Sequence, residues 1–518
     1  MRILLLSLLL LAALSASAAP GFTFTETPGP YRVGFRLVRQ YDYTRVYRGE
    51  HDLFTGKRTT SERARPIQTL VWYPAQASGA PMHYADYLAL IGSEERFDRS
   101  PADEAASAAA SLAWLVPRTM KPADVEREKT HAMWAVRDAV ATAQRFPVVI
   151  YAPSFSASAF ENADLCEFLA SHGYVVIASP SLGTRGRDMT DDLEGIETQV
   201  ADIEFLIGYA QGLANADASK IAVAGYSWGG VSNVFAAARD SRIGALVGLD
   251  GGIRFVGKLV AEAKYMHPKR IAVPFLYLQS PMPTKAEIAE HKLDDSDDFL
   301  LRLRYADVFD VTFPQVVHYH FASEHLRFLD TSDKIVFPGD HSLAEISHAY
   351  NAMARYIVDF LDAKLKGDAS AGESLAEPPR GMPPRSVEFV LRPADGVPPT
   401  RDALAAAVGR RGFGEAAVVY EEFRKKDAAF ALTPFEFMTW IGNLQELKHL
   451  SDAVEIGKLF VKVHPEMPGA YVWLADSQLM NGDRPSAVEN YRKAMRIDPA
   501  NVHLAKRVQQ IEADGDKK

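Results

Sequence analysis

Lys220-Ile-Ala-Val-Ala-Gly-Tyr-Ser-Trp-Gly-Gly230 is the stretch from which the rest of the chain can be interpreted. A short apolar run leads directly into Gly225-x-Ser227-x-Gly229, and a helix is predicted to begin near Trp228. A strand, a sharp turn and a helix in this order expose a serine at the tip of the turn, where it can act as a nucleophile. The glycines are expected where a Cβ would collide with the neighbouring strand or helix. The alternative is a buried glycine turn with a structural serine.

Strands and helices alternate on both sides of this stretch, which is typical of a parallel α/β sheet. Near-continuous apolar runs predict strands that are covered on both faces. The predicted strands are 147–152, 174–178, 220–225, 243–249, 271–278 and 308–313, with helices at 162–172, 198–209 and 349–366. The β-prone residues 31–74 precede them and predict antiparallel strands at one edge of the sheet.

The remaining segments divide the chain into predicted parts. Residues 22–366 form the α/β domain, and its alanine-rich stretch 80–145 is a helical insert that either covers the site or simply packs. Residues 367–400 are rich in Pro, Gly, Ala and Ser and predict a linker. Helical residues 401–515 repeat with the tetratricopeptide period, since Pro465 recurs as Pro499 and Ala453 as Ala487.

A serine nucleophile needs a base to take its proton and an acid to orient that base. Asp250 ends the strand after the serine, in Leu249-Asp-Gly-Gly252, and is the predicted acid; its alternative role is to cap a turn. The order Ser, Asp, His leaves four histidines open as the base: His318, His320, His325 and His341.

The oxyanion of an acyl-transfer reaction needs backbone donors. One is expected at the residue after the nucleophile, Trp228. The second is expected from the loop after strand 147–152, Pro153-Ser-Phe155-Ser, which gives Phe155 as the candidate.

Taken together, residues 145–366 resemble the α/β-hydrolase superfamily, in particular its platelet-activating-factor acetylhydrolase and dienelactone-hydrolase-like branch. The resemblance rests on Pro147 to Phe155, Leu169-Ala-Ser-His-Gly-Tyr-Val-Val-Ile-Ala178 and Asp217 to Gly230. It implies an acid in a Leu-Asp pair, which matches Asp250, and a base followed by x-x-Phe, which favours His318 over His341. Where that family usually begins its oxyanion loop with His-Gly, this chain has Pro153-Ser154.

The N-terminus predicts export. An apolar run follows Arg2, and Ala16-Ser-Ala18 resembles a signal-peptidase site, so residues 1–18 are predicted to be a signal peptide of a periplasmic or secreted protein. The run is too short to span a membrane comfortably. A net charge of −9 argues against nucleic acid as a partner. The single cysteine, Cys166, is expected to be a packed thiol.

These observations predict an exported serine hydrolase that cleaves a small or lipid-like carboxylic ester through an acyl-enzyme. Ser227, His318 and Asp250 would form the triad, Trp228 and Phe155 would provide the oxyanion donors, and no metal or cofactor is required. The alternatives are a peptidase or acyltransferase with the same triad, or a non-catalytic adaptor that uses the helical repeats. Whether those repeats bind a protein partner is left open.

Overall fold

The computed structural model describes residues 21–48, 51, 56–60, 63–76, 79–296, 298–330, 332–337, 339–383 and 386–513. The predicted signal peptide, 1–18, lies outside these residues. The chain divides into two compact units, with the boundary between Asp395 and Gly396. Among the described helices, none combines the length and the apolar character that a membrane crossing requires.

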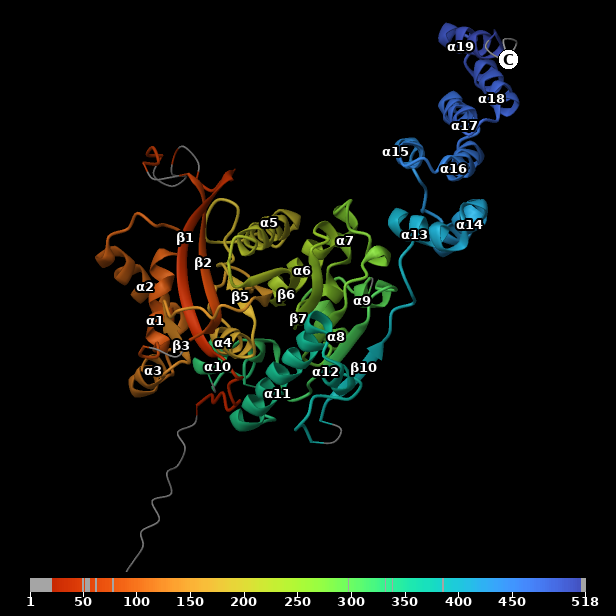
Figure 1. Ribbon diagram of the computed structural model, residues 1–518. Helices are drawn as coiled ribbons and strands as arrows, with labels where there is room; N and C mark the ends of the chain where they lie inside the picture. Colours follow the sequence, from red (N-terminus) through yellow and green to blue (C-terminus); the bar gives the residue numbers. More distant parts are fainter. Residues whose placement is uncertain are drawn as a thin grey trace, which may run out of the picture. The chain divides into compact units, whose positions relative to one another are not determined.

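A ten-stranded sheet organises the described part of the first unit (Figure 1). Its order is β10-β9-β8-β7-β6-β4-β5-β2-β1-β3. The strands from β5 to β9 pair in parallel, whereas β2 joins β5, β1 joins β2 and β10 joins β9 in antiparallel fashion. The bounds are β1 Arg32–Val46, β2 Ala64–Ala75, β3 Ala135–Arg137, β4 Phe146–Ala152, β5 Val175–Ala178, β6 Ala216–Tyr226, β7 Ile243–Leu249, β8 Phe275–Gln279, β9 Val308–Thr312 and β10 Glu388–Arg392. The predicted, mostly parallel sheet is confirmed.

Helices cover both faces of this sheet, as predicted. On one face, α4 (Ala163–Ser171) and α11 (Leu343–Leu361) pack against strand residues such as Val149. On the other face, α5 (Leu193–Ala210) and α6 (Trp228–Arg239) pack against residues such as Val148. Consecutive strand residues point to opposite faces, so a strand needs apolar side chains throughout to serve both layers. Cys166 on α4 is a buried free thiol.

Smaller helices complete the first unit. Residues 80–145 hold α1 (Tyr84–Leu88), η1 (Ala89–Ser93), α2 (Pro101–Leu115) and α3 (Pro122–Lys129), and also the short strand β3. The others are η2 (Ile253–Phe255), α7 (Gly257–Glu262), η3 (Pro268–Arg270), α8 (Lys285–Glu290), α9 (Phe299–Arg302), η4 (His318–Phe321), α10 (Ser323–Arg327) and η5 (Asp362–Lys366). The fifteen residues of α2 include none that is buried, although the helix lies next to η1.

The predicted linker 367–400 requires a correction, because most of it belongs to the first unit. Helix α12 (Ala369–Ser374) lies within it, and β10 pairs Phe389 with Val311 of β9. Phe389 also packs edge-on against Tyr356 of α11. The surrounding prolines and glycines give this five-residue edge strand a weak sequence pattern. Residues 393–400 lie between β10 and α13, and the boundary between the two units falls within them.

The second unit is helical, with α13 (Arg401–Arg411), η6 (Phe413–Glu415), α14 (Ala416–Lys426), α15 (Pro434–Glu446), α16 (Leu450–Val463), α17 (Pro468–Met480), α18 (Arg484–Ile497) and α19 (Val502–Ala513). The starts of α15, α17 and α19 lie 34 residues apart, at Pro434, Pro468 and Val502. The starts of α16 and α18 have the same spacing, which is the period seen in the sequence. The assignment to the tetratricopeptide family stays a prediction.

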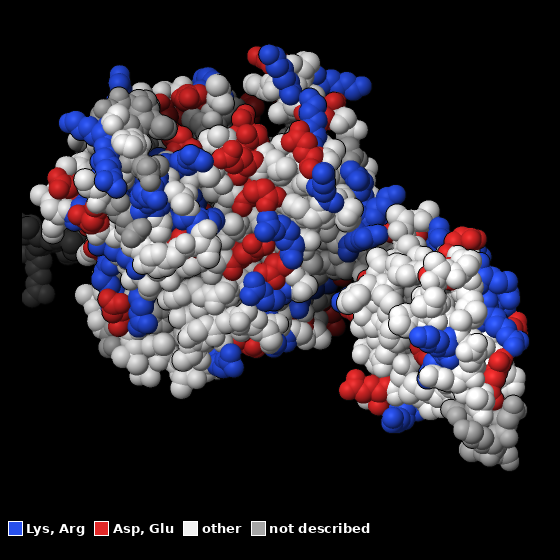
Figure 2. Space-filling view, turned by 90° about the horizontal axis from the view of Figure 1, so that it is seen from above, with Lys and Arg blue, Asp and Glu red and all other residues white. Residues whose placement is uncertain are grey.

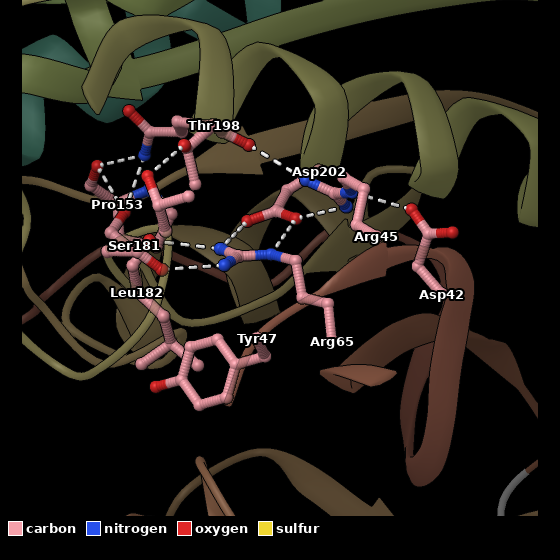
Figure 3. Close-up of polar contacts among 12 residues, drawn as sticks. Asp42, Arg45, Tyr47, Arg65, Pro153, Ser181, Leu182, Thr198 and Asp202 are labelled. Atoms are coloured by element: carbon pink, nitrogen blue, oxygen red, sulfur yellow. Dashed lines mark hydrogen bonds and ion pairs between the residues drawn. The ribbon is translucent and has the colours of Figure 1, made fainter. Parts of the chain in front are cut away.

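A buried ion-pair network ties the β1–β2 hairpin to α5 (Figure 3). Arg65, only 2% exposed, donates to both carboxylate oxygens of Asp202, at 2.7 and 2.6 Å. Its remaining donors reach the carbonyls of Leu182 and Gly183, at 2.9 and 2.7 Å. Arg45 adds a further bond of 2.6 Å to Asp202. The network therefore holds the loop after β5 against both elements.

We expect Asp202→Ala to lower the free energy of unfolding by ~3–5 kcal/mol, because the Arg65 guanidinium would be left buried without its partner. Urea unfolding of the first unit, followed by tryptophan fluorescence, measures the change. Asp240→Ala is the matched control, since Asp240 is also buried but the side chain of its partner Arg242 is 41% exposed and stays hydrated. Equal losses of unfolding free energy in Asp202→Ala and Asp240→Ala would contradict a special contribution of this network to stability.

Candidate active site

Ser227 lies at the sharp turn between β6 and α6. Its φ of 53° and ψ of −117° are a strained combination for a residue with a side chain. A Cβ on Gly225 would overlap the backbone of Gly229, and one on Gly229 would overlap the Ala152 carbonyl. The Ser227 amide donates to the Leu249 carbonyl at 2.9 Å, which holds the turn against β7. The two glycines therefore permit the tight turn that was predicted from the sequence.

Asp250 follows β7 directly and has a φ of 47°. Its amide donates to the Leu278 carbonyl of β8 at 2.7 Å. The carboxylate accepts the Ser280 amide at 2.8 Å and the Ser280 hydroxyl at 3.0 and 3.1 Å. These contacts orient the carboxylate, which is mostly shielded from solvent, toward His318.

His318 begins η4, shortly after β9, and joins the other two residues. Its Nδ1 lies 2.7 Å from Asp250 Oδ2, and its Nε2 lies 2.9 Å from Ser227 Oγ. The carboxylate can only accept, so the bonding pattern assigns the proton to Nδ1 and leaves Nε2 to accept the serine hydroxyl. The Tyr226 hydroxyl donates to the His318 carbonyl at 3.0 Å, which fixes the backbone of the histidine.

The other three histidines do not join this arrangement. The His320 ring accepts the Val317 amide and contacts the Val336 carbonyl, and burial lowers its pKa to about 4. His325 lines the pocket next to Tyr226, and burial lowers its pKa to about 4 as well. His341 lies just before α11. Within the described residues, only His318 bonds to both Ser227 and Asp250.

The two predicted oxyanion donors lie on neighbouring segments. The Phe155 and Trp228 rings meet edge to face, with centroids 5.7 Å apart. Neither backbone amide donates a hydrogen bond to another part of the described chain, which leaves both N–H groups available to a substrate. The residue before Phe155 is held by Glu161, a buried side chain that sequence reasoning did not single out.

A pocket of about 810 Å³ opens at Ser227 and His318. Part of its wall comes from the 80–145 insert, including Trp114 and Leu115 at the end of α2. The insert therefore contributes directly to the site. Trp114 is 93% exposed, whereas the other five tryptophans are buried or half-buried.

The described residues include no group of three or more His, Cys, Asp or Glu side chains that could hold a metal ion. On the face drawn in Figure 2, Lys and Arg side chains are interspersed with Asp and Glu.

Residues 124–255 match a family model described as chlorophyllase. A putative carboxymethylenebutenolidase of Methylorubrum extorquens is 26% identical over 118 residues, which cover 20% of this chain and 38% of that protein. The chain thus spans well under half of the curated relative that it matches. The structure of a ferulic acid esterase from Streptomyces cinnamoneus is 19% identical with a TM-score of 0.49, covering 71% of this chain and 99% of that one.

The first unit has the mostly parallel, helix-covered sheet that was predicted from the sequence. Part of the chain resembles the chlorophyllase family model and the putative carboxymethylenebutenolidase. The curated match agrees with the predicted likeness to dienelactone-hydrolase-like enzymes. The likeness to platelet-activating-factor acetylhydrolases stays a prediction.

Proposed function

We propose that the chain is a serine esterase that cleaves a carboxylic ester through an acyl-enzyme. The observation that carries the proposal is the unbroken row of contacts from Ser227 Oγ through the His318 ring to Asp250, at 2.9 and 2.7 Å. A serine is a weak nucleophile until a neighbouring base accepts its proton, and the base needs an oriented tautomer.

In the proposed reaction, Ser227 Oγ attacks the ester carbonyl carbon while His318 Nε2 takes the hydroxyl proton. The Trp228 and Phe155 amides stabilise the negative charge on the carbonyl oxygen. His318 then gives the proton to the departing alcohol, which leaves the acyl group on Ser227. A water molecule attacks this acyl-enzyme in the same way, releasing the acid and restoring the serine. Asp250 keeps the imidazole oriented and stabilises its charged form.

Hydrolysis of a graded series of p-nitrophenyl esters tests the proposal, together with labelling of Ser227 by a fluorophosphonate. A peptidase or an acyltransferase with the same triad would also react with the fluorophosphonate. For efficient turnover, however, the peptidase would need a peptide and the acyltransferase a second acceptor. If the protein neither reacts with the fluorophosphonate nor hydrolyses any ester, the hypothesis of a non-catalytic adaptor replaces the proposal. We also propose that residues 1–18 direct export and that the second unit is tetratricopeptide-like. The signal-peptide pattern supports the first proposal, and the 34-residue repeat supports the second.

The pocket favours an ester with a group larger than acetyl. Its volume of about 810 Å³ lies toward the upper end of small-molecule sites. Trp114 lines it with a ring that is almost fully exposed, so a bound acyl or alcohol chain can bury that ring at a gain in affinity.

We expect Trp114→Ala to lower kcat/KM for p-nitrophenyl octanoate by ~10-fold, equivalent to about 1.4 kcal/mol of lost binding. The effect on p-nitrophenyl acetate should stay below about threefold, because its acyl group is too short to reach the ring. Phe435→Ala removes an exposed aromatic ring from the second unit and serves as the control. An equal loss for both esters would show that Trp114 does not select for size.

A further inference from the structure

The loop that carries Phe155 has an unusual backbone. Its residues are Pro153-Ser-Phe-Ser156, without a glycine, and Ser156 adopts a φ of 55°. A non-glycine residue is rarely found in this left-handed region unless the surrounding structure holds it there. The shape of this loop therefore depends on contacts from outside it.

Glu161 supplies those contacts on one side of Phe155. Its Oε1 accepts the Ser154 amide at 2.7 Å, and its Oε2 lies 2.6 Å from Ser154 Oγ. The Tyr151 hydroxyl also donates to Oε1, at 3.0 Å, so the carboxyl is anchored to β4. Glu161 is fully buried and also borders the pocket at Ser227.

The loop after β5 supplies the contacts on the other side. Arg187 donates to the Ser156 carbonyl at 3.1 Å, and the Met189 amide donates to Ser156 Oγ at 2.9 Å. Both neighbours of Phe155 are thus held by bonds to other segments. The direction of the Phe155 amide, which makes no bond of its own within the described chain, follows from these two anchors.

The same region reaches the segment that carries His318. The Glu161 carbonyl accepts the Glu324 amide at 2.9 Å. The neighbouring Asn162 donates to the Phe321 carbonyl at 2.8 Å and accepts the Ser323 amide at 3.0 Å. Residues 161 and 162 therefore connect the oxyanion loop to the end of η4, which begins at His318.

We propose that Glu161 is a positioning residue for ester hydrolysis. It holds the Phe155 amide in the position, relative to Ser227 and His318, in which it can bind the oxyanion. The inference rests on the proposed function. Glu161 does not touch the reacting atoms; it acts through Ser154. A displacement of about 1 Å at an oxyanion donor is enough to slow catalysis strongly, because stabilisation of the transition state depends on the placement of its donors.

The protonation state of Glu161 suggests a conservative replacement. Burial raises its pKa to about 8, so the carboxyl is mostly neutral at pH 7. A glutamine has the same shape: its carbonyl can accept the Ser154 amide while its NH₂ group donates to Ser154 Oγ. Leucine has a similar size but keeps neither contact.

The experiment compares Glu161→Leu and Glu161→Gln with Glu167→Leu, using p-nitrophenyl ester hydrolysis and thermal unfolding. Glu167 is the matched control, because its carboxyl is also buried and also makes hydrogen bonds to a tyrosine hydroxyl and a backbone amide, those of Tyr87 and Trp134, both at 2.6 Å. None of those partners lies in the oxyanion loop. Both leucine variants are expected to lose similar amounts of thermal stability.

We expect Glu161→Leu to lower kcat by ~10²-fold with little change in KM, the size of effect that follows loss of one oxyanion donor. Glu161→Gln should stay within about threefold of wild type, and Glu167→Leu should keep wild-type kcat in its folded fraction. If Glu161→Leu does not fold, Ser154→Ala replaces it, with an expected ~10-fold loss of kcat from removing the Oγ contact.

Three results would overturn the inference. The first is a folded Glu161→Leu variant whose kcat lies within threefold of wild type, and the second is an equal kcat loss in Glu167→Leu. The third result is an unchanged kcat in Ser154→Ala, where that variant is measured in place of Glu161→Leu. Each of these leaves the esterase proposal intact as long as the wild type is active and Ser227 is required. A wild type that is inert and does not label with fluorophosphonate overturns both.

Discussion

Replacing Ser227 by alanine is expected to lower kcat/KM for p-nitrophenyl esters by ~10⁴–10⁶-fold, because the acyl-enzyme then has no oxygen on which to form. The residual rate would come from the oxyanion donors and from substrate binding, which the substitution leaves in place. Fluorophosphonate labelling should disappear in parallel. Since Ser227 Oγ bonds to His318 and the strained backbone is set by the glycines beside it, the fold should survive the change.

Ser232→Ala is the matched control for this experiment. Ser232 lies on the same helix, α6, and its hydroxyl is buried without a hydrogen-bond partner in the described structure. Removing that hydroxyl should leave kcat/KM unchanged and should not lower stability. A Ser227→Ala enzyme that keeps more than a tenth of the wild-type activity would exclude an acyl-enzyme on this residue.

The sequence allowed the central sheet and the serine turn to be predicted because both depend on local patterns. Strands that are buried on both faces are apolar throughout, and β4 and β5 show this in their sequence. The turn requires Gly225 and Gly229 at fixed offsets from Ser227. Asp250 could be placed because the strand after the turn ends directly before it.

Residues that depend on long-range packing were harder to predict. Four histidines lie between the last parallel strand and α11, and a loop has no periodicity that tells which of them turns toward Ser227. The order of residues alone left the base open, and the family resemblance favoured the histidine that the structure brings to Ser227. The strand β10 was missed because five edge residues inside a Pro- and Gly-rich stretch give a weak pattern.

Glu161 illustrates the same limit for polar side chains. In the sequence it is an acidic residue just before a helix, where a capping role is the ordinary expectation. Its proposed role depends on the approach of Ser154, seven residues earlier, and on the packing of α10 against α4. Trp114 is similar, since an alanine-rich helix gives no indication of which residues will face a pocket.

The second large effect is expected from replacing His318, the proposed base. His318→Ala should lower kcat by ~10⁴–10⁶-fold, because no other described side chain can take the proton from Ser227 Oγ. Asp250→Asn should cost ~10⁴-fold, because the amide can offer a donor to Nδ1 and favour the wrong tautomer of the ring. His341→Ala is the control, since His341 has no contact with Ser227 or Asp250 among the described bonds, and its kcat should equal that of wild type.

The combination of variants decides whether the three residues act as one unit. If His318 serves only to activate Ser227, the double variant Ser227→Ala/His318→Ala should be no slower than either single variant, because each already removes the same step. If the two residues contributed independently, the fold-losses of kcat would multiply. The double variant would then be slower than either single variant by the full fold-loss of the other substitution. A His341→Ala variant as inactive as His318→Ala would reassign the base. Multiplicative losses in the double variant, with both singles folded, would instead mean that Ser227 and His318 act in separate steps.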